Sequence, residues 1–111
     1  MARDSLGDVE HFVLVALLHL DGESYVVPIR REIARRTGRE IARPAVYIAL
    51  KRLAAKQFVT SRVGDPTPVR GGRAKRFFKL TPAGVRQLRE SREAFVRMWE
   101  GADALARRAS R

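Results

Sequence analysis

Apolar residues recur at helical spacing near the start of the chain and predict a helix that begins at Asp8, a favourable N-cap. The tripeptide Asp21-Gly22-Glu23 ends it. A small domain can hardly cover a helix that is apolar on nearly all sides, so we predict that one side faces a second subunit. The two sides consist of Val9, Phe12, Val13, Ala16, Leu17 and Leu20, and of Leu14, Val15 and Leu18.

Two further helices follow in the pattern. The second begins between Ser24 and Pro28 and ends at Gly38, because proline is tolerated in a first turn and glycine favours a C-terminal stop. The third runs from Pro44 to Lys56. Its apolar face consists of Val46, Ala49, Leu50 and Leu53. The opposite face carries Ala45, Ile48, Lys51 and Arg52, with Tyr47 on the flank.

The pattern then becomes strand-like. Residues 58–63 and 74–80 are rich in β-branched and aromatic side chains, which predicts two paired strands. Residues 64–73 between them combine glycines, prolines and two arginines, which predicts a mobile loop at the tip of a β-wing.

One long helix is predicted to close the chain, with Thr81 as N-cap and Pro82 in its first turn. Its apolar positions alternate spacings of three and four, as in a helix that packs along another helix. These positions are Val85, Leu88, Phe95, Trp99, Ala102 and Ala106. The predicted fold is mainly α with a two-stranded β-wing: a winged helix-turn-helix over residues 1–81 and a dimerisation helix over residues 82–111.

Composition narrows the class of protein. A chain of 111 residues is expected to form one domain, and its lack of cysteine excludes a disulfide framework, a thiolate metal site and a cysteine nucleophile. No apolar run reaches the roughly 20 residues of a membrane span, and no signal-peptide cleavage site follows Met1. We therefore expect a cytoplasmic protein with no membrane partner.

Motifs for catalysis are missing from the sequence. It contains no P-loop, no HExxH motif and no Ser-His-Asp set, so we expect neither an enzyme nor a cofactor. His11 and His19 lie eight residues apart, about 12 Å along a helix, which is too far for one metal ion.

Positive charge is concentrated in the middle of the chain. Residues 30–79 hold 15 of the 23 Lys and Arg residues but only 3 of the 12 Asp and Glu residues, a net charge of +12, whereas the remaining residues hold 8 against 9. Such a block attracts polyanions, because neutralising phosphates releases condensed counterions. Its coincidence with the third helix and the wing indicates nucleic-acid recognition.

In a winged helix-turn-helix the second helix of the pair enters the major groove, and the wing contacts the backbone or minor groove. On that helix we expect Ala45 and Ile48 to meet thymine methyl groups, and Lys51 and Arg52 to meet phosphate or guanine. Tyr47 would donate to a phosphate. Further expected contacts are Arg43 at the amino end and Arg70, Arg73, Lys75 and Arg76 in the wing. The alternative is that each of these cations is an ordinary solvated side chain that does not contact DNA.

Aromatic and large apolar residues mark a second candidate site. Phe12, Phe95, Met98 and Trp99 are the expected dimer interface, and Trp99 is the only tryptophan. Two interpretations remain open for Trp99: interface packing, or a platform on which a planar aromatic effector stacks at the dimer centre.

Three stretches of the sequence together resemble the PadR family of bacterial transcriptional regulators, over about residues 6–99. They are LGDVE at 6–10, PAVYIALKRL at 44–53 and GRAKRFFKLTPAG at 72–84. The resemblance implies a homodimer, joined through its first and last helices, whose recognition helices enter successive major grooves of a palindromic operator. It also implies repression of nearby genes, often for detoxification, efflux or phenolic-acid response, relieved by a small molecule.

Within that resemblance, Tyr47 matches the family's tyrosine on the recognition helix, and Gly72 and Arg73 match its wing motif. Gln57 stands where the family usually has glycine after the recognition helix, so we expect a different cap there. Phe78 replaces a common tyrosine. The single predicted C-terminal helix resembles the family's shorter branch, which implies an effector pocket between subunits.

Three functions are compatible with this sequence. The leading hypothesis is a dimeric, sequence-specific DNA-binding repressor. The runner-up is a non-specific architectural protein that binds DNA or RNA, which would keep the salt dependence without sequence preference. The third is an interaction module whose basic face binds an acidic protein.

Overall fold

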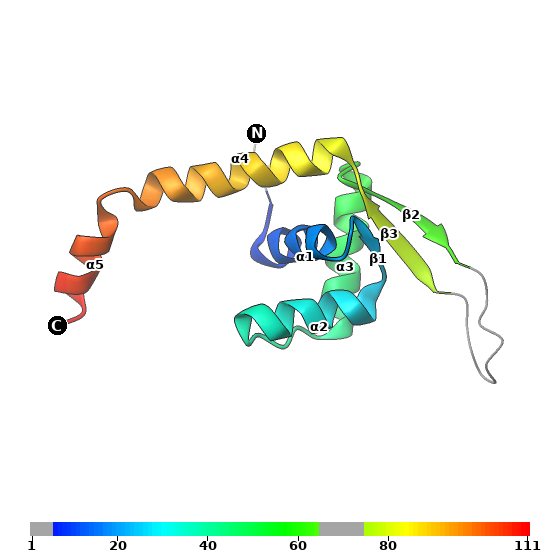
Figure 1. Cartoon of the computed structure of the whole chain (residues 1–111), viewed down its shortest axis with the longest axis horizontal. Coiled ribbons are helices and arrows are strands. Elements are labelled where there is room, and N and C mark those ends of the chain that lie inside the picture. Colours follow the sequence, from blue (N-terminus) through cyan, green and yellow to red (C-terminus); the bar gives the residue numbers. More distant parts are fainter. Residues whose placement is uncertain (1–5, 65–74) are drawn as a thin grey trace.

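The computed structural model describes residues 6–64 and 75–111 of the chain (Figure 1). Helices α1 (Asp8–His19), α2 (Val26–Thr37) and α3 (Arg43–Ala55) form a body, and beside it lie strands β1 (Glu23–Ser24), β2 (Val59–Val63) and β3 (Arg76–Leu80). Helix α4 (Pro82–Trp99) passes over the body and projects beyond it, and α5 (Ala102–Ala109) leaves its far end at a steep angle. The predicted winged-helix class is confirmed.

The hydrophobic core lies where the three helices of the body meet the sheet and the first half of α4. Helix α1 contacts α2, α3 and α4, which explains why it is apolar on more than one side. The predicted buried face of α3 is confirmed, since Val46, Ala49, Leu50 and Leu53 are all buried. The remaining core residues are Val13, Leu14, Ala16, Leu17, Ile29, Ile33, Phe58, Val59, Phe78 and Leu88.

The sheet has three antiparallel strands in the order β1-β3-β2, one more than predicted. Strands β2 and β3 pair from Val59 opposite Leu80 to Val63 opposite Arg76, as the strand pattern predicts. The additional strand β1 places Glu23 opposite Lys79 and Ser24 opposite Phe78. It was missed because two residues produce no strand pattern and become a strand only through pairing with β3.

The prediction of one long C-terminal helix is wrong. Helix α4 ends at Trp99, and α5 starts at Ala102. Gly101 between them has φ of 76°, a left-handed conformation that glycine adopts without steric cost and that a continuous helix does not contain. The apolar spacing continues across the break, which is why periodicity alone concealed it.

The first helix begins differently from the prediction. Gly7, not Asp8, is the N-cap, and the Glu10 carboxylate accepts the Gly7 N–H at 3.2 Å. The same carboxylate lies 3.0 Å from Lys56 Nζ and is largely buried, so it ties the start of α1 to the end of α3. The third helix likewise begins one residue early, at Arg43, with Pro44 in its first turn.

The turn after α3 keeps left-handed geometry although its residue is not glycine. Gln57 has φ of 66°, its N–H donates to Ala54 O at 3.0 Å, and the Phe58 N–H donates to Leu53 O at 2.9 Å. These two bonds form a Schellman cap. The expectation of a different cap at Gln57 is therefore wrong, because the hydrogen bonds hold a side-chain-bearing residue in that conformation.

The start of α4 is fastened to this turn. Thr81 is the predicted N-cap and is confirmed: its Oγ1 accepts the Gly84 N–H at 3.0 Å and donates to Gln57 O at 2.8 Å. Gly84 is required because a Cβ there would lie 2.3 Å from the carbonyl oxygen of Phe58. Helix α4 therefore leaves the sheet in one direction, over α1.

Candidate nucleic-acid interface

One face of α3 is solvent-exposed along its length. Its residues predicted to contact DNA are all exposed, including Tyr47 at 40% and Ile48 at 49%. The others are Arg43, Ala45, Lys51 and Arg52. The four buried residues of the opposite face fix the rotation of the helix about its axis, so they also determine which side chains are presented outward.

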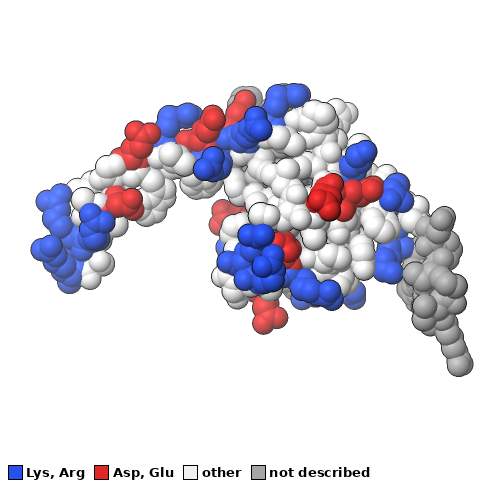
Figure 2. Space-filling model, in the orientation of Figure 1, with Lys and Arg blue, Asp and Glu red and all other residues white. Residues whose placement is uncertain are grey.

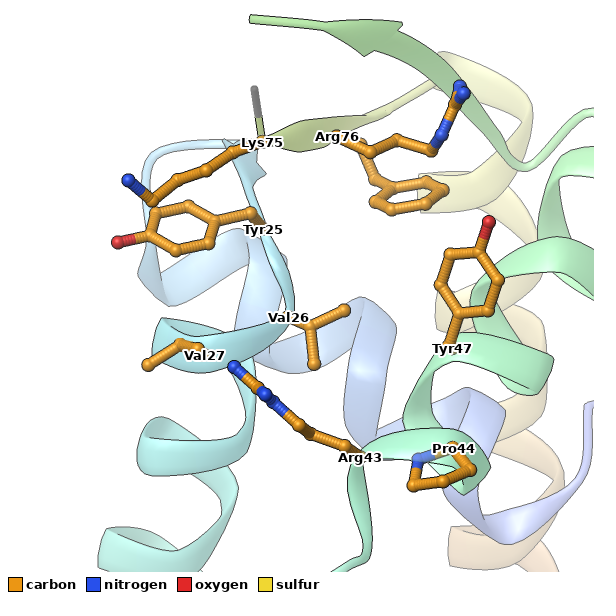
Figure 3. Close-up of a pocket in the computed structure, with 9 residues that line it drawn as sticks. Tyr25, Val26, Val27, Arg43, Pro44, Tyr47, Lys75 and Arg76 are labelled. Carbon is orange, nitrogen blue, oxygen red and sulfur yellow. The ribbon is translucent and has the colours of Figure 1, made fainter. Parts of the chain in front are cut away.

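Residues of the wing and of α3 meet in a groove of about 400 Å³ (Figure 3). Arg43, Pro44 and Tyr47 come from α3, and Lys75, Arg76 and Phe78 from the strand end. The beginning of α2 and the residue before it complete the lining with Tyr25, Val26 and Val27. The structure therefore brings together four of the predicted contacts: Arg43, Tyr47, Lys75 and Arg76. Arg70 and Arg73 lie outside the described residues.

Aromatic rings support the cations at this surface. Lys51 Nζ lies 5.8 Å from the Tyr47 ring centroid, and Tyr47 itself packs edge-on against buried Phe78 at 6.4 Å. Lys75 Nζ lies 5.2 Å from the ring of Tyr25. Tyr25 was not predicted as a site residue, because its place next to the end of β3 depends on the pairing of β1 with β3.

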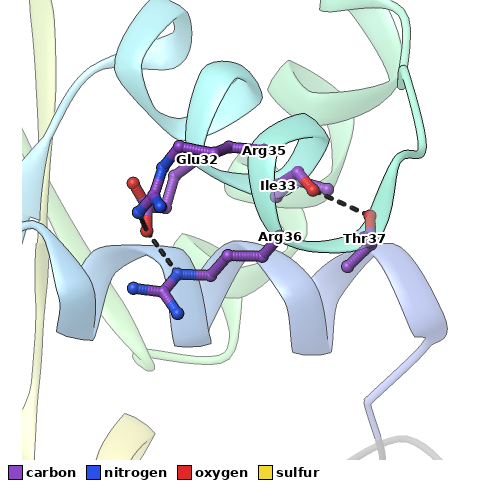
Figure 4. Close-up of polar contacts among 5 residues, drawn as sticks. All are labelled: Glu32, Ile33, Arg35, Arg36 and Thr37. Carbon is purple, nitrogen blue, oxygen red and sulfur yellow. Dashed lines mark hydrogen bonds and ion pairs between the residues drawn. The ribbon is translucent and has the colours of Figure 1, made fainter.

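Charge compensation divides the cations of the central block into two groups. Glu32 pairs with Arg35 and Arg36 on α2 (Figure 4), Glu10 pairs with Lys56, and Glu23 pairs with Arg62. Hydrogen bonds from Arg36 and Arg62 hold the pKa values of Glu32 and Glu23 below their ordinary value. These four cations are less available to an external anion.

The second group has no carboxylate within ion-pair distance in the described part of the chain. It includes the predicted contacts Arg43, Lys51, Arg52, Lys75 and Arg76, and also Arg30, Arg31, Arg39 and Lys79. Figure 2 shows basic side chains gathered over α2 and beside the strands, whereas basic and acidic side chains alternate along α4. An uncompensated cationic surface next to an exposed helix face is the arrangement that favours phosphate binding.

The predicted interface residues lie away from this surface. Phe95, Met98 and Trp99 on the projecting part of α4 are 57%, 80% and 53% exposed. Phe12 and Phe95 line one hollow of about 370 Å³ between the start of α1 and α4. Trp99 lies at the end of α4, one turn beyond Phe95.

His11 joins α1 to α4. Its Nδ1 lies 3.2 Å from Ser91 Oγ, and its ring meets the Phe95 ring edge-on at 6.4 Å. Burial lowers the pKa of His11, and the nearby Asp8 carboxylate opposes this only in part. Within residues 6–64 and 75–111, no three potential metal ligands cluster, and no helix is long and apolar enough to cross a membrane.

The family model described as the transcriptional regulator PadR-like family matches residues 13–90. Among curated proteins, none matches the sequence.

Solved structures with the same fold include two clostridial regulators. The PadR family transcription regulator from Clostridium difficile R20291 is 18% identical, with 90% of this chain and 99% of that chain covered and a TM-score of 0.73. The transcriptional regulator Cth-833 from Clostridium thermocellum is 21% identical, with 86% and 87% covered and a TM-score of 0.71.

A third structure is Bacillus subtilis PadR in complex with operator DNA, which is 21% identical, with 75% of this chain and 45% of that chain covered and a TM-score of 0.62. At these identities the structures show a shared fold. The family model matches well over half of the sequence, and the protein therefore belongs to the PadR-like family of transcriptional regulators.

Proposed function

We propose that the protein is a homodimeric repressor that binds a palindromic DNA operator in the cytoplasm, with no enzymatic role. One observation carries the proposal: the exposed face of α3 and the strand end form a continuous surface whose cations lack carboxylate partners in the described part of the chain. The DNA complex of Bacillus subtilis PadR, which has the same fold, supports the choice of DNA as partner.

Roles within this surface follow from the chemistry of each side chain. Ala45 and Ile48 present small or apolar surface suited to thymine methyl groups. Lys51 and Arg52 contact phosphate or guanine, and the hydroxyl of Tyr47 donates to a phosphate. Phosphate contacts come from Arg43 and from the wing residues Arg70, Arg73, Lys75 and Arg76.

Dimerisation is proposed through α1 and the projecting part of α4. Phe12, Phe95, Met98 and Trp99 supply the apolar surface that a second subunit would cover. A homodimer places two copies of α3 on one side of a duplex, which matches a palindromic site. Relief of repression by a small molecule is proposed as the regulatory step.

The DNA-binding proposal is tested by selecting bound fragments from random duplexes and then titrating the selected site at rising salt. We expect a palindromic consensus and a steep loss of affinity, since log K falls by about 0.9 per phosphate contact for each log unit of salt. Equal binding to every duplex would instead support the architectural alternative.

The contact assignment is tested with the double variant Lys51→Gln and Arg73→Gln. We expect weaker operator binding and a smaller salt slope, because each subunit loses two proposed contacts. The matched control, Arg107→Gln with Arg108→Gln, removes the same charge from α5, far from α3 (Figure 1), and should leave the slope unchanged. Operator binding that survives the first variant unaltered contradicts the assignment and favours an acidic protein partner.

The proposed role of Trp99 as an effector platform has a spectroscopic test. Planar aromatic compounds stacked on its ring should quench its fluorescence, and the bound compound should lower operator affinity. Trp99→Ala should abolish the effect on operator affinity. If Trp99→Ala leaves that effect intact, Trp99 is interface packing only.

A further inference from the structure

Glu10 is the one charged residue that is buried among residues 6–64 and 75–111. Its side chain is 9% exposed and that of Lys56 is 23% exposed, with 3.0 Å between Glu10 Oε1 and Lys56 Nζ. The cost of removing two charges from water offsets much of their attraction, so a buried ion pair is a weak means of stabilising a fold. A well-attested use of buried polar contacts is to fix the register of packed helices. The pair therefore calls for a geometric explanation.

The pair joins two helices at their ends. Glu10 lies in the first turn of α1, where the same Oε1 accepts the Gly7 N–H at 3.2 Å, whereas Lys56 is the C-cap of α3. The carbonyl of the next residue, Gln57, accepts the Thr81 hydroxyl at 2.8 Å, which fastens the start of α4 to the same place. Polar contacts thus hold the end of α3 against both α1 and α4, the two helices through which dimerisation is proposed.

The start of α1 also lies at the proposed dimer contact. Gly7 and Asp8 line the hollow of about 370 Å³ that contains Phe12 and Phe95. In a twofold-symmetric dimer, a displacement of α3 relative to α1 occurs once in each subunit, so it enters the distance between the two α3 helices twice. Glu10 therefore connects the surface that a second subunit would cover with the helix proposed to read DNA.

Apolar packing alone leaves the position of α3 less well defined. Val46, Leu50 and Leu53 determine the rotation of the helix, but apolar contacts are non-directional, whereas a charged hydrogen bond has a defined distance and direction. We propose that Glu10 and Lys56 are positioning residues that hold α3 at one place relative to α1 and α4, and thereby set the half-site spacing that the dimer accepts. The spacing role rests on the proposed function, whereas the positioning of α3 does not.

The double variant Glu10→Gln with Lys56→Met removes both charges. Glutamine keeps an oxygen for the Gly7 N–H, and methionine keeps an unbranched side chain, so we expect a urea midpoint close to that of the wild-type protein. The matched control, Glu32→Gln with Arg36→Met, removes the same charges from an ion pair that lies within α2 alone. Should the double variant unfold, Lys56→Gln, which keeps a hydrogen-bond donor beside Glu10, takes its place in each measurement.

The position of α3 is measured without DNA. Because the chain has no cysteine, two cysteines introduced at Ala45 and Arg97 can carry a pair of spin labels, and dilution with unlabelled protein isolates the distance within one chain. These exposed residues lie in the first turn of α3 and the last turn of α4. We expect one narrow distance in the wild-type and control proteins and a broader or shifted distribution in the double variant. An unchanged distribution in the folded double variant overturns the proposal.

Half-site spacing is measured with operators that have one base pair added or removed between the half-sites, a change of about 3.4 Å and about 34°. We expect the wild-type and control proteins to prefer the native spacing at least about tenfold, and the double variant to discriminate at least about threefold less. Affinity for an isolated half-site should be unchanged, which a general loss of structure would not allow. Lys56→Arg keeps the charge and should retain the wild-type preference.

The outcomes separate the positioning role from the proposed function. If the distance distribution changes but no duplex is bound specifically, the positioning of α3 stands and the proposed function fails. If the distribution changes and the double variant still discriminates between spacings as the wild-type protein does, the spacing role is overturned. Lower affinity for the isolated half-site would mean that the pair maintains the shape of α3 itself, and it would also overturn the spacing role.

Discussion

Gln57 is strained where the turn after α3 requires left-handed backbone. Its φ of 66° costs a side-chain-bearing residue about 1 kcal/mol, whereas glycine reaches it without a steric penalty. The cost is tolerated because the Schellman bonds and the Thr81 hydroxyl on the Gln57 carbonyl hold the turn. None of these hydrogen bonds uses the glutamine side chain.

We therefore expect Gln57→Gly to increase the free energy of unfolding by about 1 kcal/mol, measured by urea denaturation. The matched control is Ala55→Gly, two residues earlier inside the last turn of α3, which should lower it by a similar amount because helical glycine is unfavourable. The opposite signs are the test. A loss of stability in Gln57→Gly would mean that the side chain makes a stabilising contact.

The positions of some site residues could be predicted from the sequence, whereas the positions of others could not. The outward face of α3 was predicted correctly, because four apolar positions at helical spacing determine its rotation. The ring of Tyr25 beside Lys75 was not predicted, because it depends on β1, whose pairing joins residues far apart in the chain. Local periodicity carries no information about such a contact.

At the scale of elements, the C-terminal helices show where periodicity fails. Their apolar spacing fits one helix, yet Gly101 separates α4 from α5. A single residue with left-handed φ changes the direction of the chain without disturbing the sequence pattern on either side. The first part of this stripe packs on α1, with Leu88 in the core, whereas Phe95 and Trp99 are exposed, so packing of the rest along another helix stays a prediction.

Replacing Gly101 should change the junction between the two helices. Gly101→Ala favours right-handed backbone, so we expect α4 and α5 to merge into one helix. The chain has no cysteine, so two introduced cysteines at positions 90 and 109 of the same chain can carry a pair of spin labels. Labelled protein diluted with unlabelled protein should show a distance near about 29 Å for a continuous helix, and a shorter one with Gly101. Equal distances in both proteins would contradict the role of Gly101.

The contact between α1 and α4 should depend on pH through His11. Burial lowers the pKa of His11 in the folded state below the ordinary value of 6.5, so the unfolded chain takes up a proton first as pH falls. The stabilisation is therefore complete above pH 6.5 and is lost as pH falls through the lower, folded-state pKa.

Denaturation of the wild-type protein and of His11→Gln across this range measures the effect. Below pH 6.5 we expect the free energy of unfolding to decline less steeply in the variant than in the wild-type protein, because glutamine does not titrate. The control His19→Gln changes an exposed residue on the same helix and should keep the wild-type slope. An unchanged slope in His11→Gln would show that other groups govern the acid response.

The whole molecule is more extended than a compact domain of its length. Its radius of gyration is 16.4 Å, against about 13 Å for 111 residues in a compact fold. Helix α4 projects from the body and carries large apolar side chains into solvent, among them Phe95, Met98 and Trp99. A second copy of the chain is the proposed cover for this surface.

This view predicts that the double variant Phe95→Glu and Trp99→Glu is a folded monomer. Both side chains are more than half exposed in one subunit, so the core remains intact while buried charge disfavours association. Light scattering coupled to gel filtration should show half the wild-type mass, and thermal unfolding should stay cooperative. The control Glu93→Lys with Arg97→Glu alters charges elsewhere on α4 and should remain dimeric.

Operator binding connects this assembly with function. A monomer engages one half-site at a time. Loss of the link between two DNA-binding subunits lowers the affinity for the full palindrome by a factor of about 10²–10⁴. We expect this loss for the palindrome, whereas affinity for an isolated half-site should be nearly unchanged, because α3 and the wing are intact. An unfolded variant would instead show that Phe95 and Trp99 stabilise the subunit itself, and an unchanged mass would place the dimer interface elsewhere on the molecule.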